Sequence, residues 1–358
     1  MATLAKNLDR DAFVVTVFCF YPKGSLLEEL RGEGIRVVSL RKRGRWDLVA
    51  FFRRLRAEMM MVQPDVIHSF MGPPNLLAVL LKRSLPETKV IWGIRSSRMY
   101  FADYDYSWRI VFALERFLSA RADRIVANSF AGCDDIASFG FHPGSLHVVP
   151  NGIDVDRFIP SGSARVKLRA EWNVAPDQPL IGLVARLDSK KDHANFLKAA
   201  ALLAAERTGV RFVCVGADGR QDRRELQAMA QDLGLGERII WPGYSDRVEA
   251  VYPALDVNTL SSAYGEGFPN CIAEAMAAGV PCVVTDVGDS ARIVGDYGSV
   301  VPPRDPAALA GGWRRLLDLS DDDKESLARN CRTTIQDNYS QSVMVQKMAS
   351  MYTELANI

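Results

Sequence analysis

Two glutamates in the second half of the chain have neighbours that suit a ligand-binding or catalytic carboxylate. Glu266 stands between Gly265 and Gly267, and Glu274 is the only charged residue between Gly267 and Pro281. A carboxylate among apolar neighbours is costly to bury without a hydrogen-bonding partner. That partner is either a ligand or a group of the protein that forms a salt bridge or a cap.

The residues around these glutamates predict a loop that opens onto a short helix. Pro269 suits the first helical turn and Gly279 the helix end, so we expect the order strand, glycine loop, helix, strand. Backbone N–H groups at a helix N-terminus bind anions. The donors placed there are the amides of Gly267, Phe268 and Asn270.

Three cations follow another apolar run, at residues 180–185. Arg186, Lys190 and Lys191 come where a strand would deliver them, and ligands of open α/β sheets bind outside the carboxyl ends of the strands. Arginine supplies a planar fork for phosphate oxygens, and lysine supplies a point charge. An ordinary exposed loop is the alternative for these cations.

The two glutamates suit different parts of one ligand. Glu266 would repel a phosphate, so it suits sugar hydroxyls or a developing positive charge. Glu274, further along the helix, is able to accept hydrogen bonds from vicinal hydroxyls such as those of a ribose. We expect the cations, the loop amides and the carboxylates to converge on one anion.

Short apolar runs alternate with helical segments along the whole chain, which is typical of parallel sheets covered on both faces. The polar residues 161–178 separate two such series. We expect an N-terminal domain at 1–160, a C-terminal domain at 161–338 and a last helix at 339–358. No Gly-x-Gly-x-x-Gly sequence is present, which argues against a dehydrogenase. The predicted strands are 13–20, 35–40, 65–69, 89–93, 124–127, 146–149, 180–185, 211–216, 239–241, 256–260, 280–285 and 299–301.

Composition narrows the class of protein. The 358 residues are 48% hydrophobic and 24% charged, with a net charge of +1, so no overall attraction to nucleic acid is expected. The six cysteines form no C-x-x-C pair and indicate buried free thiols in a reducing compartment. The four histidines lack metal-binding spacing, and neither a signal peptide nor a membrane span is recognisable. The cytoplasm is the expected location.

Residues 41–56 form a basic segment with aromatic side chains. Such a helix lies on an anionic membrane surface, or it is the solvated face of an ordinary covering helix. It lacks the extended basic stripe of a nucleic-acid-binding protein. The cations are Arg41, Lys42, Arg43, Arg45, Arg53, Arg54 and Arg56, against the single acid Asp47, with Trp46, Phe51 and Phe52 between them.

Taken together, these motifs resemble family 4 of the retaining glycosyltransferases, whose GT-B fold has two Rossmann-like doubly wound α/β domains facing across a cleft. The spacing Glu266-x7-Glu274, with Gly-Phe-Pro-Asn inside it, is the first match. The other matches are 150–154 (Pro-Asn-Gly-Ile-Asp), 185–193 (Ala-Arg-Leu-Asp-Ser-Lys-Lys-Asp-His) and 286–290 (Asp-Val-Gly-Asp-Ser). The resemblance spans nearly the whole chain.

The resemblance implies a role for each residue. Arg186 and Lys191 would hold the diphosphate of a nucleotide sugar, Glu274 the ribose hydroxyls, and Glu266 the donor sugar. Arg186, Lys191 and Glu266 would be catalytic, and no metal or other cofactor is expected because the two cations would neutralise the leaving diphosphate. The last helix would cross back onto the N-terminal domain. The other donor-binding positions would be Gly267, Phe268, Pro269 and Asn270 at the phosphate or sugar, Tyr244 and Ser245 near the base, and Asn151 and Gly152 near the interdomain hinge.

Two features depart from the family pattern. Relatives usually begin with a strand and a glycine-rich loop, whereas this chain starts at Met1, inside what should be the first helix. We therefore expect an N-terminal domain that lacks its first strand, or a misassigned start codon. Where many relatives have a histidine after the strand at 89–93, this chain has Arg95 and Ser96 on the acceptor side. Arg95 would hold an acceptor pyrophosphate, and a salt bridge within the domain is its alternative.

The sequence thus predicts a retaining glycosyltransferase of the hexosyltransferase type. It would move a sugar from a nucleotide-diphosphate sugar, expected to be UDP-linked, to a saccharide or lipid-linked acceptor in cell-envelope polysaccharide synthesis. Residues 41–56 would dock it as a peripheral protein on the inner face of the membrane. Two alternatives stay open: a non-catalytic or weakly active truncated GT-B protein, and a nucleotide-sugar epimerase on the same fold.

Overall fold

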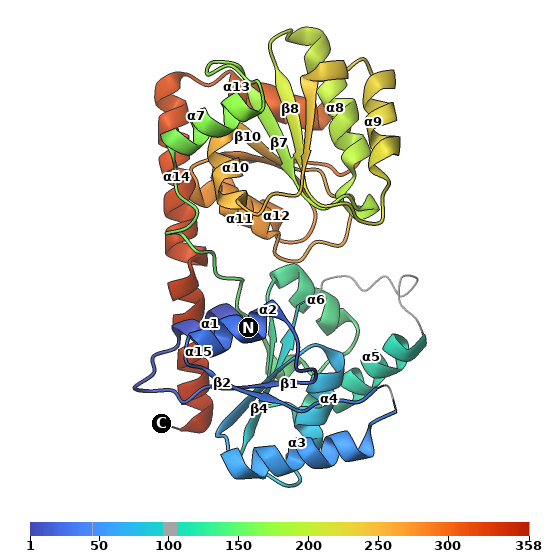
Figure 1. The fold of residues 1–358 in the computed structure, drawn as a ribbon, viewed down its shortest axis with the longest axis vertical. Helices are drawn as coiled ribbons and strands as arrows, with labels where there is room; N and C mark the ends of the chain where they lie inside the picture. Colours follow the sequence, from blue (N-terminus) through green and yellow to red (C-terminus); the bar gives the residue numbers. More distant parts are fainter. Residues whose placement is uncertain (45, 96–105, 358) are drawn as a thin grey trace. The chain divides into compact units, whose positions relative to one another are not determined.

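The computed structural model describes residues 1–44, 46–95 and 106–357, which form two compact α/β units (Figure 1). The first unit combines Met1–Gly152 with Gln341–Ile358, and the second is Ile153–Ser340. The first division falls before the expected boundary at 160, because Ile153 and Phe158 are buried in the core of the second unit. The two ends of the second unit meet, since the Ile153 amide donates to the Tyr339 carbonyl at 2.8 Å.

The second unit is built on one six-stranded sheet in which all neighbouring strands are parallel, in the order β12-β11-β10-β7-β8-β9. Its central strands are apolar runs buried on both faces, as the sequence pattern predicts. The chain order reverses between β7 and β10, and ligands bind at such switch points. The strands are β7 (Leu180–Val184), β8 (Arg211–Val215), β9 (Ile239–Gly243), β10 (Val257–Leu260), β11 (Cys282–Thr285) and β12 (Gly298–Val301).

Helices cover both faces of this sheet and divide its interior into two cores. Ile272 and Met276 lie in one core, and Phe196 and Trp313 lie in the other. The helices are α7 (Gly162–Glu171), α8 (His193–Glu206), α9 (Arg223–Asp232), α10 (Val248–Ala254), α11 (Asn270–Ala277), α12 (Ser290–Val294), α13 (Pro306–Leu317) and α14 (Asp321–Tyr339).

The first unit contains two separate parallel sheets, β3-β4-β5-β6 and β1-β2, and among the described residues no hydrogen-bonded ladder joins them. Alternate residues of β4 enter different cores, because Val90 and Trp92 pack on one face and Ile91 on the other. The strands are β1 (Thr16–Cys19), β2 (Arg36–Ser39), β3 (Val66–Phe70), β4 (Lys89–Ile94), β5 (Arg124–Ala127) and β6 (Leu146–Val148).

Two layers of helices enclose the four-stranded sheet. The core on the Trp92 face takes Phe51, Val79 and Phe112 from three successive helices, and the opposite core joins the first helix to the last through Leu4 and Met348. The helices are α1 (Ala2–Asn7), α2 (Ser25–Gly32), α3 (Val49–Val62), α4 (Gly72–Leu81), α5 (Tyr106–Leu118), α6 (Phe130–Ser138) and α15 (Gln341–Ala356).

All six cysteines are free thiols, as expected, but only Cys214, Cys282 and Cys331 are buried. The expectation of burial is therefore wrong for the other three, which are partly exposed. Within the described ranges, no helix is both long enough and apolar enough to cross a bilayer.

Candidate functional site

The loop after β7 presents cations on a well-defined frame. Asp188 accepts hydrogen bonds from the Lys190 amide at 3.3 Å and from Arg186 Nη2 at 3.0 Å. Burial opposes ionisation of Asp188, but the Lys190 amide and the Arg186 guanidinium outweigh it and hold the pKa of this carboxyl below its usual value. The Arg186 side chain is still 60% exposed, so its guanidinium can reach a ligand.

Lys191 and Glu266 form a largely buried ion pair in the loops that follow the carboxyl ends of β7 and β10. Lys191 Nζ lies 2.6 Å from Glu266 Oε1, and the Ser262 hydroxyl donates to the same oxygen at 2.6 Å. Burial by itself would lower the pKa of Lys191, but the Glu266 carboxylate more than reverses this and raises it. The structure thus brings together two of the three residues predicted to be catalytic, although they lie 75 positions apart in the chain.

Hydrogen bonds join the loops that carry this pair. The Ala263 amide donates to the Lys190 carbonyl at 2.8 Å, and the Ser261 hydroxyl donates to the Lys191 carbonyl at 2.7 Å. These bonds connect the end of β10 to the end of β7, its neighbour in the sheet. The ion pair therefore rests on two strands rather than on one mobile loop.

The glycine loop is held by a third segment, the one that follows β11. The Asp289 amide donates to the Gly267 carbonyl at 2.9 Å. Gly288 has φ +63°, and a Cβ added there would lie 2.5 Å from the Glu266 carbonyl oxygen. Only glycine fits this contact, which accounts for the glycine in the motif at 286–290.

Glu274 has a partner within the protein. The Tyr252 hydroxyl donates to Glu274 Oε2 at 2.6 Å. Burial raises the pKa of Glu274, while the Tyr252 hydrogen bond and the nearby charge of Arg157 oppose that rise. Oε1 accepts no hydrogen bond from any residue that the structure describes, and the internal partner therefore satisfies one oxygen of two.

The neighbouring residues of the glycine loop have mixed environments. Phe268 and Pro269 are buried, and the Phe268 ring packs against Tyr339 with 5.4 Å between ring centroids. Asn270 is exposed and opens α11, with Pro269 at the N-cap. Phe268 and Pro269 thus fix the loop against the core.

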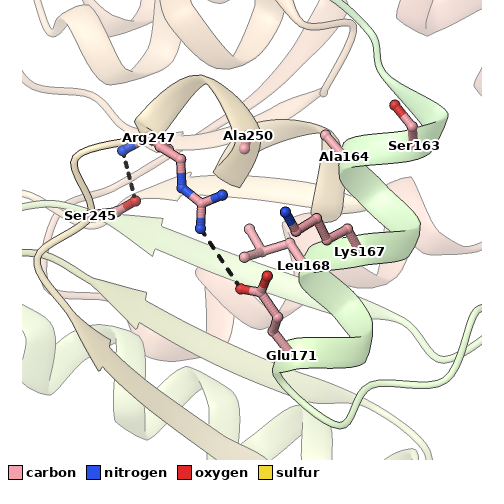
Figure 2. A pocket seen from close by; sticks show the side chains of 8 residues that line it. All are labelled: Ser163, Ala164, Lys167, Leu168, Glu171, Ser245, Arg247 and Ala250. Carbon is pink, nitrogen blue, oxygen red and sulfur yellow. Dashed lines mark hydrogen bonds and ion pairs between the residues drawn. The ribbon is translucent and has the colours of Figure 1, made fainter.

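Tyr244 and Ser245 follow β9, and Tyr244 is well exposed. Ser245 lines a pocket of about 240 Å³ between α7 and α10, together with Lys167, Glu171 and Arg247 (Figure 2). The Ser245 hydroxyl is occupied by the Arg247 amide at 3.2 Å. The two residues therefore lie between β9 and α10, at the carboxyl ends of the strands, where Arg186 also lies after β7.

The structure places Asn151 and Gly152 in the first unit rather than with the donor-side residues. Asn151 Oδ1 accepts hydrogen bonds from Arg95 Nη1 at 2.7 Å and from Asn128 Nδ2 at 3.3 Å. The Arg95 guanidinium also lies over the Phe70 ring, 5.3 Å from its centroid. Ser96 lies outside the described residues. Arg95 is thus held by an amide and a ring, and no residue that the structure describes forms a salt bridge with it.

His68 is a residue that the sequence analysis missed. Its Nδ1 lies 2.7 Å from the Tyr352 hydroxyl, while Nε2 is buried and has no hydrogen-bond partner among the residues that the structure describes. Burial, reinforced by the charge of Arg95, lowers the pKa of His68 to about 3, so the ring is neutral at neutral pH. His68 and Arg95 line one small cavity at the carboxyl ends of β3 and β4. His68 lies near the end of one predicted strand and Arg95 just after another, but their proximity depends on which strands become neighbours.

Within 1–44, 46–95 and 106–357, no group of three His, Cys, Asp or Glu side chains is arranged to hold a metal ion. Arg186 and Lys191 are two of the cations that the second unit carries in the loop after β7. Cations fixed in this way stabilise negative charge that develops on a leaving group. A carboxylate, Glu266, stands at the same place and suits hydroxyl groups of the same ligand.

Comparison with known proteins shows that both halves of the chain are similar to glycosyltransferases. The model described as "Glycosyltransferase Family 4" matches residues 1–157, and the one described as "Glycosyl transferases group 1" matches residues 178–319. Putative glycosyltransferase EpsF of Bacillus subtilis is 33% identical over 193 residues, which cover 51% of this chain and 50% of that protein. The chain spans about half the length, or less, of the curated relatives that share about a third of their residues with it.

Solved structures share the fold along almost the whole chain. Anabaena Alr3699/HepE in complex with UDP superposes with a TM-score of 0.84 at 20% identity, over 99% of this chain and 94% of that one. The apo form of the lipopolysaccharide outer core galactosyltransferase WaaB gives 0.67 at 17% identity, over 93% and 87%. A glycosyltransferase family model thus matches each half of the chain, and the two units have the GT-B architecture of the solved structures.

Proposed function

We propose that this protein is a retaining glycosyltransferase of the hexosyltransferase type. It moves a sugar from a nucleotide-diphosphate sugar to a saccharide or lipid-linked acceptor in cell-envelope polysaccharide synthesis. The observation that carries this proposal is the cluster in which Lys191 and Ser262 both bind Glu266 Oε1, with the exposed guanidinium of Arg186 in the same loop as Lys191. Two cations and a carboxylate at one sheet edge match a ligand that is anionic at one end and hydroxylated at the other.

Each part of the donor has a proposed partner. Arg186 and Lys191 bind the diphosphate and neutralise the charge that develops when the bond to the sugar breaks. Glu266 contacts the sugar, and Ser262 holds that carboxylate in place. Glu274 accepts hydrogen bonds from the ribose hydroxyls through Oε1, since Tyr252 occupies Oε2.

We propose UDP as the nucleotide. Support comes from Anabaena Alr3699/HepE, whose structures were solved with UDP and with UDP-glucose and share this fold. The name of the outer core galactosyltransferase WaaB, another protein with the fold, supports a role in the cell envelope. Tyr244 and Ser245 are the residues we assign to the base, and Arg95 and Ser96 are assigned to the acceptor.

A metal ion is not needed in this scheme, because Arg186 and Lys191 supply the positive charge. Sugar transfer is therefore expected to continue in the presence of a strong chelator. Loss of transfer in EDTA, with recovery on adding Mg²⁺ or Mn²⁺, would contradict the proposed role of the two cations.

We also propose that residues 41–56 bring the enzyme to the inner face of the membrane. Trp46 is 88% exposed in this segment. Part of the basic charge is used within the protein, since Arg54 binds Asp47 at 2.5 Å and Arg56 binds Ser84 at 2.6 Å. Arg45 lies outside the described residues. Arg41, Arg43 and Arg53 are exposed and are the charges assigned to anionic lipid.

Calorimetry of the full chain with a panel of UDP- and GDP-sugars tests the function. Arg186→Ala and Glu274→Ala are each expected to weaken binding of the correct donor by about 10- to 100-fold, the effect of losing one charge-assisted contact. Arg207→Ala is the matched control, because this arginine pairs with Asp318 at the far end of α8.

Three outcomes would count against the proposal. If no nucleotide sugar binds, the protein is a non-catalytic member of the family. If the sugar is isomerised with no acceptor present, the protein is an epimerase. If both alanine variants bind the donor as tightly as the original chain does, the assignment of Arg186 and Glu274 is wrong.

A further inference from the structure

Helix α5 carries an apolar stripe on its outer surface. Tyr106 is 77% exposed, Ile110 46%, Leu114 44% and Phe117 78%. Their spacing of four, four and three residues aligns them along one side of the helix, over about 16 Å. Exposed large apolar residues that are contiguous in this way mark an interaction surface, whereas single ones do not.

The stripe is not needed for the packing of α5 on its own unit. The opposite side of the helix supplies Phe112 to the core that contains Trp92, and buried Glu115 binds Asn75 at 2.7 Å. A helix that is apolar on its inner and on its outer side requires a second apolar environment. The described part of the first unit provides one on the inner side only.

The charge on α5 indicates what that second environment is. Arg109 and Arg116 are exposed and lie on one flank of the stripe, and Arg121 is exposed just beyond the helix end. Glu115 is the one acidic residue between Tyr106 and Leu118, and it is buried. Within the described residues of α5 the apolar stripe is bordered by arginines and no acid is exposed, which is complementary to a surface with an apolar interior and anionic headgroups. Asp103 and Asp105, which precede the helix, lie outside the described residues.

We propose that α5 docks on an anionic membrane, with Tyr106, Ile110, Leu114 and Phe117 inserted at the level of the headgroups and the arginines among the phosphates. The proposal deepens the membrane-associated function proposed above and rests on it for its purpose, which is to hold the enzyme where lipid-linked acceptors are. It assigns the apolar part of the attachment to a helix other than the basic segment 41–56. The two surfaces belong to the same unit.

Vesicle co-sedimentation of the full chain tests this surface. Vesicles of phosphatidylcholine with phosphatidylglycerol are compared with vesicles of phosphatidylcholine alone. The variant is Leu114→Gln with Phe117→Gln, and its matched control is Val166→Gln with Leu202→Gln, two exposed apolar side chains of the second unit. All four positions are exposed, so the substitutions leave the folded cores intact.

The original chain and the control are expected to bind anionic vesicles, and more weakly at high salt. The α5 variant is expected to partition about 100-fold less, because each apolar side chain removed from a membrane interface costs roughly tenfold. Arg109→Gln with Arg116→Gln is expected to reduce binding to anionic vesicles only. Equal partitioning of the α5 variant and the original chain would overturn the proposal.

Two further measurements distinguish failure of the membrane-docking proposal from failure of the proposed glycosyltransferase function. If the original chain is a dimer in buffer and the α5 variant is a monomer in sedimentation velocity, a second copy covers the stripe and the proposal is wrong. Donor affinity is measured on the same variant and should equal that of the original chain. Vesicle binding without any nucleotide binding would retain the docking surface and reject the glycosyltransferase function instead.

Discussion

Glu115 offers a direct test of the electrostatics inside the first unit. This carboxyl group is 3% exposed, and Asn75 Nδ2 donates a hydrogen bond to Oε1 at 2.7 Å. Burial raises its pKa from 4.5 to about 7, and the bond from Asn75 opposes part of that rise. Glu115→Gln keeps the shape of the side chain and the acceptor for Asn75, but it removes the titration.

The direction in which stability changes with pH follows from proton linkage. Between about pH 4.5 and 7 the folded chain keeps the proton on Glu115 while the unfolded chain has lost it, so stability falls as the pH rises through this range. The rise in pKa corresponds to about 3 kcal/mol. Relative to the original chain, Glu115→Gln should therefore gain stability from pH 4.5 to 7, by about 3 kcal/mol at most, and should gain nothing more above pH 8.

Native-state hydrogen exchange followed by mass spectrometry suits this test, because peptides from β4 and α5 report on the first unit alone. The difference between the variant and the original chain cancels carboxyl groups such as Asp47 and Asp188, whose lowered pKa values act at lower pH. A difference that stays constant from pH 4.5 to 8 would refute the reasoning.

Three other substitutions probe the second unit. Tyr252→Phe removes the hydrogen bond to Glu274 of α11, which should raise the pKa of that carboxyl further. Donor binding measured by calorimetry should weaken about tenfold. Unchanged affinity would contradict a role for this hydrogen bond in donor binding. Gly288→Ala should destabilise the unit by more than about 2 kcal/mol in urea unfolding, whereas Gly311→Ala, in an open position within α13, should be neutral or stabilising. Equal effects of the two substitutions would show that the backbone at Gly288 can shift to accept a Cβ atom. Lys191→Met leaves the carboxylate of Glu266 buried without its cation, so it should lower the free energy of unfolding by about 3 kcal/mol or more. Adding Glu266→Gln should recover part of this loss. A double variant less stable than either single variant would argue against a paired charge.

The sequence was sufficient for the alternating architecture, because apolar runs such as 180–185 and 280–285 are long, uncharged and bounded by turn residues. It did not predict α6, whose first turn is capped by Ser129 at 3.0 Å from the Gly132 amide, nor the short α12. Both helices are brief and their apolar periodicity is weak. Their stability comes from packing in the finished unit.

The candidate site was predictable where chemistry is local and unpredictable where it depends on pairing across the sheet. The glycine loop and the cations after β7 were recognisable from spacing alone. The partner of Glu274 was not, because Tyr252 comes from a helix on another crossover, 22 positions away. The role of Ser262 and the place of His68 beside Arg95 likewise depend on which strands become neighbours.

The meeting of Ile153 with Tyr339 makes the second unit a self-contained insert in the chain. All of the strands β7 to β12 lie between its two ends, so cutting at 153 and 340 separates no strand from its sheet. Such a segment is suited to expression by itself, to isotope labelling for nucleotide titrations by NMR, and to exchange with the corresponding half of a related protein. Under the proposed function, recombination at these two adjacent junctions would exchange the donor-binding half as one piece.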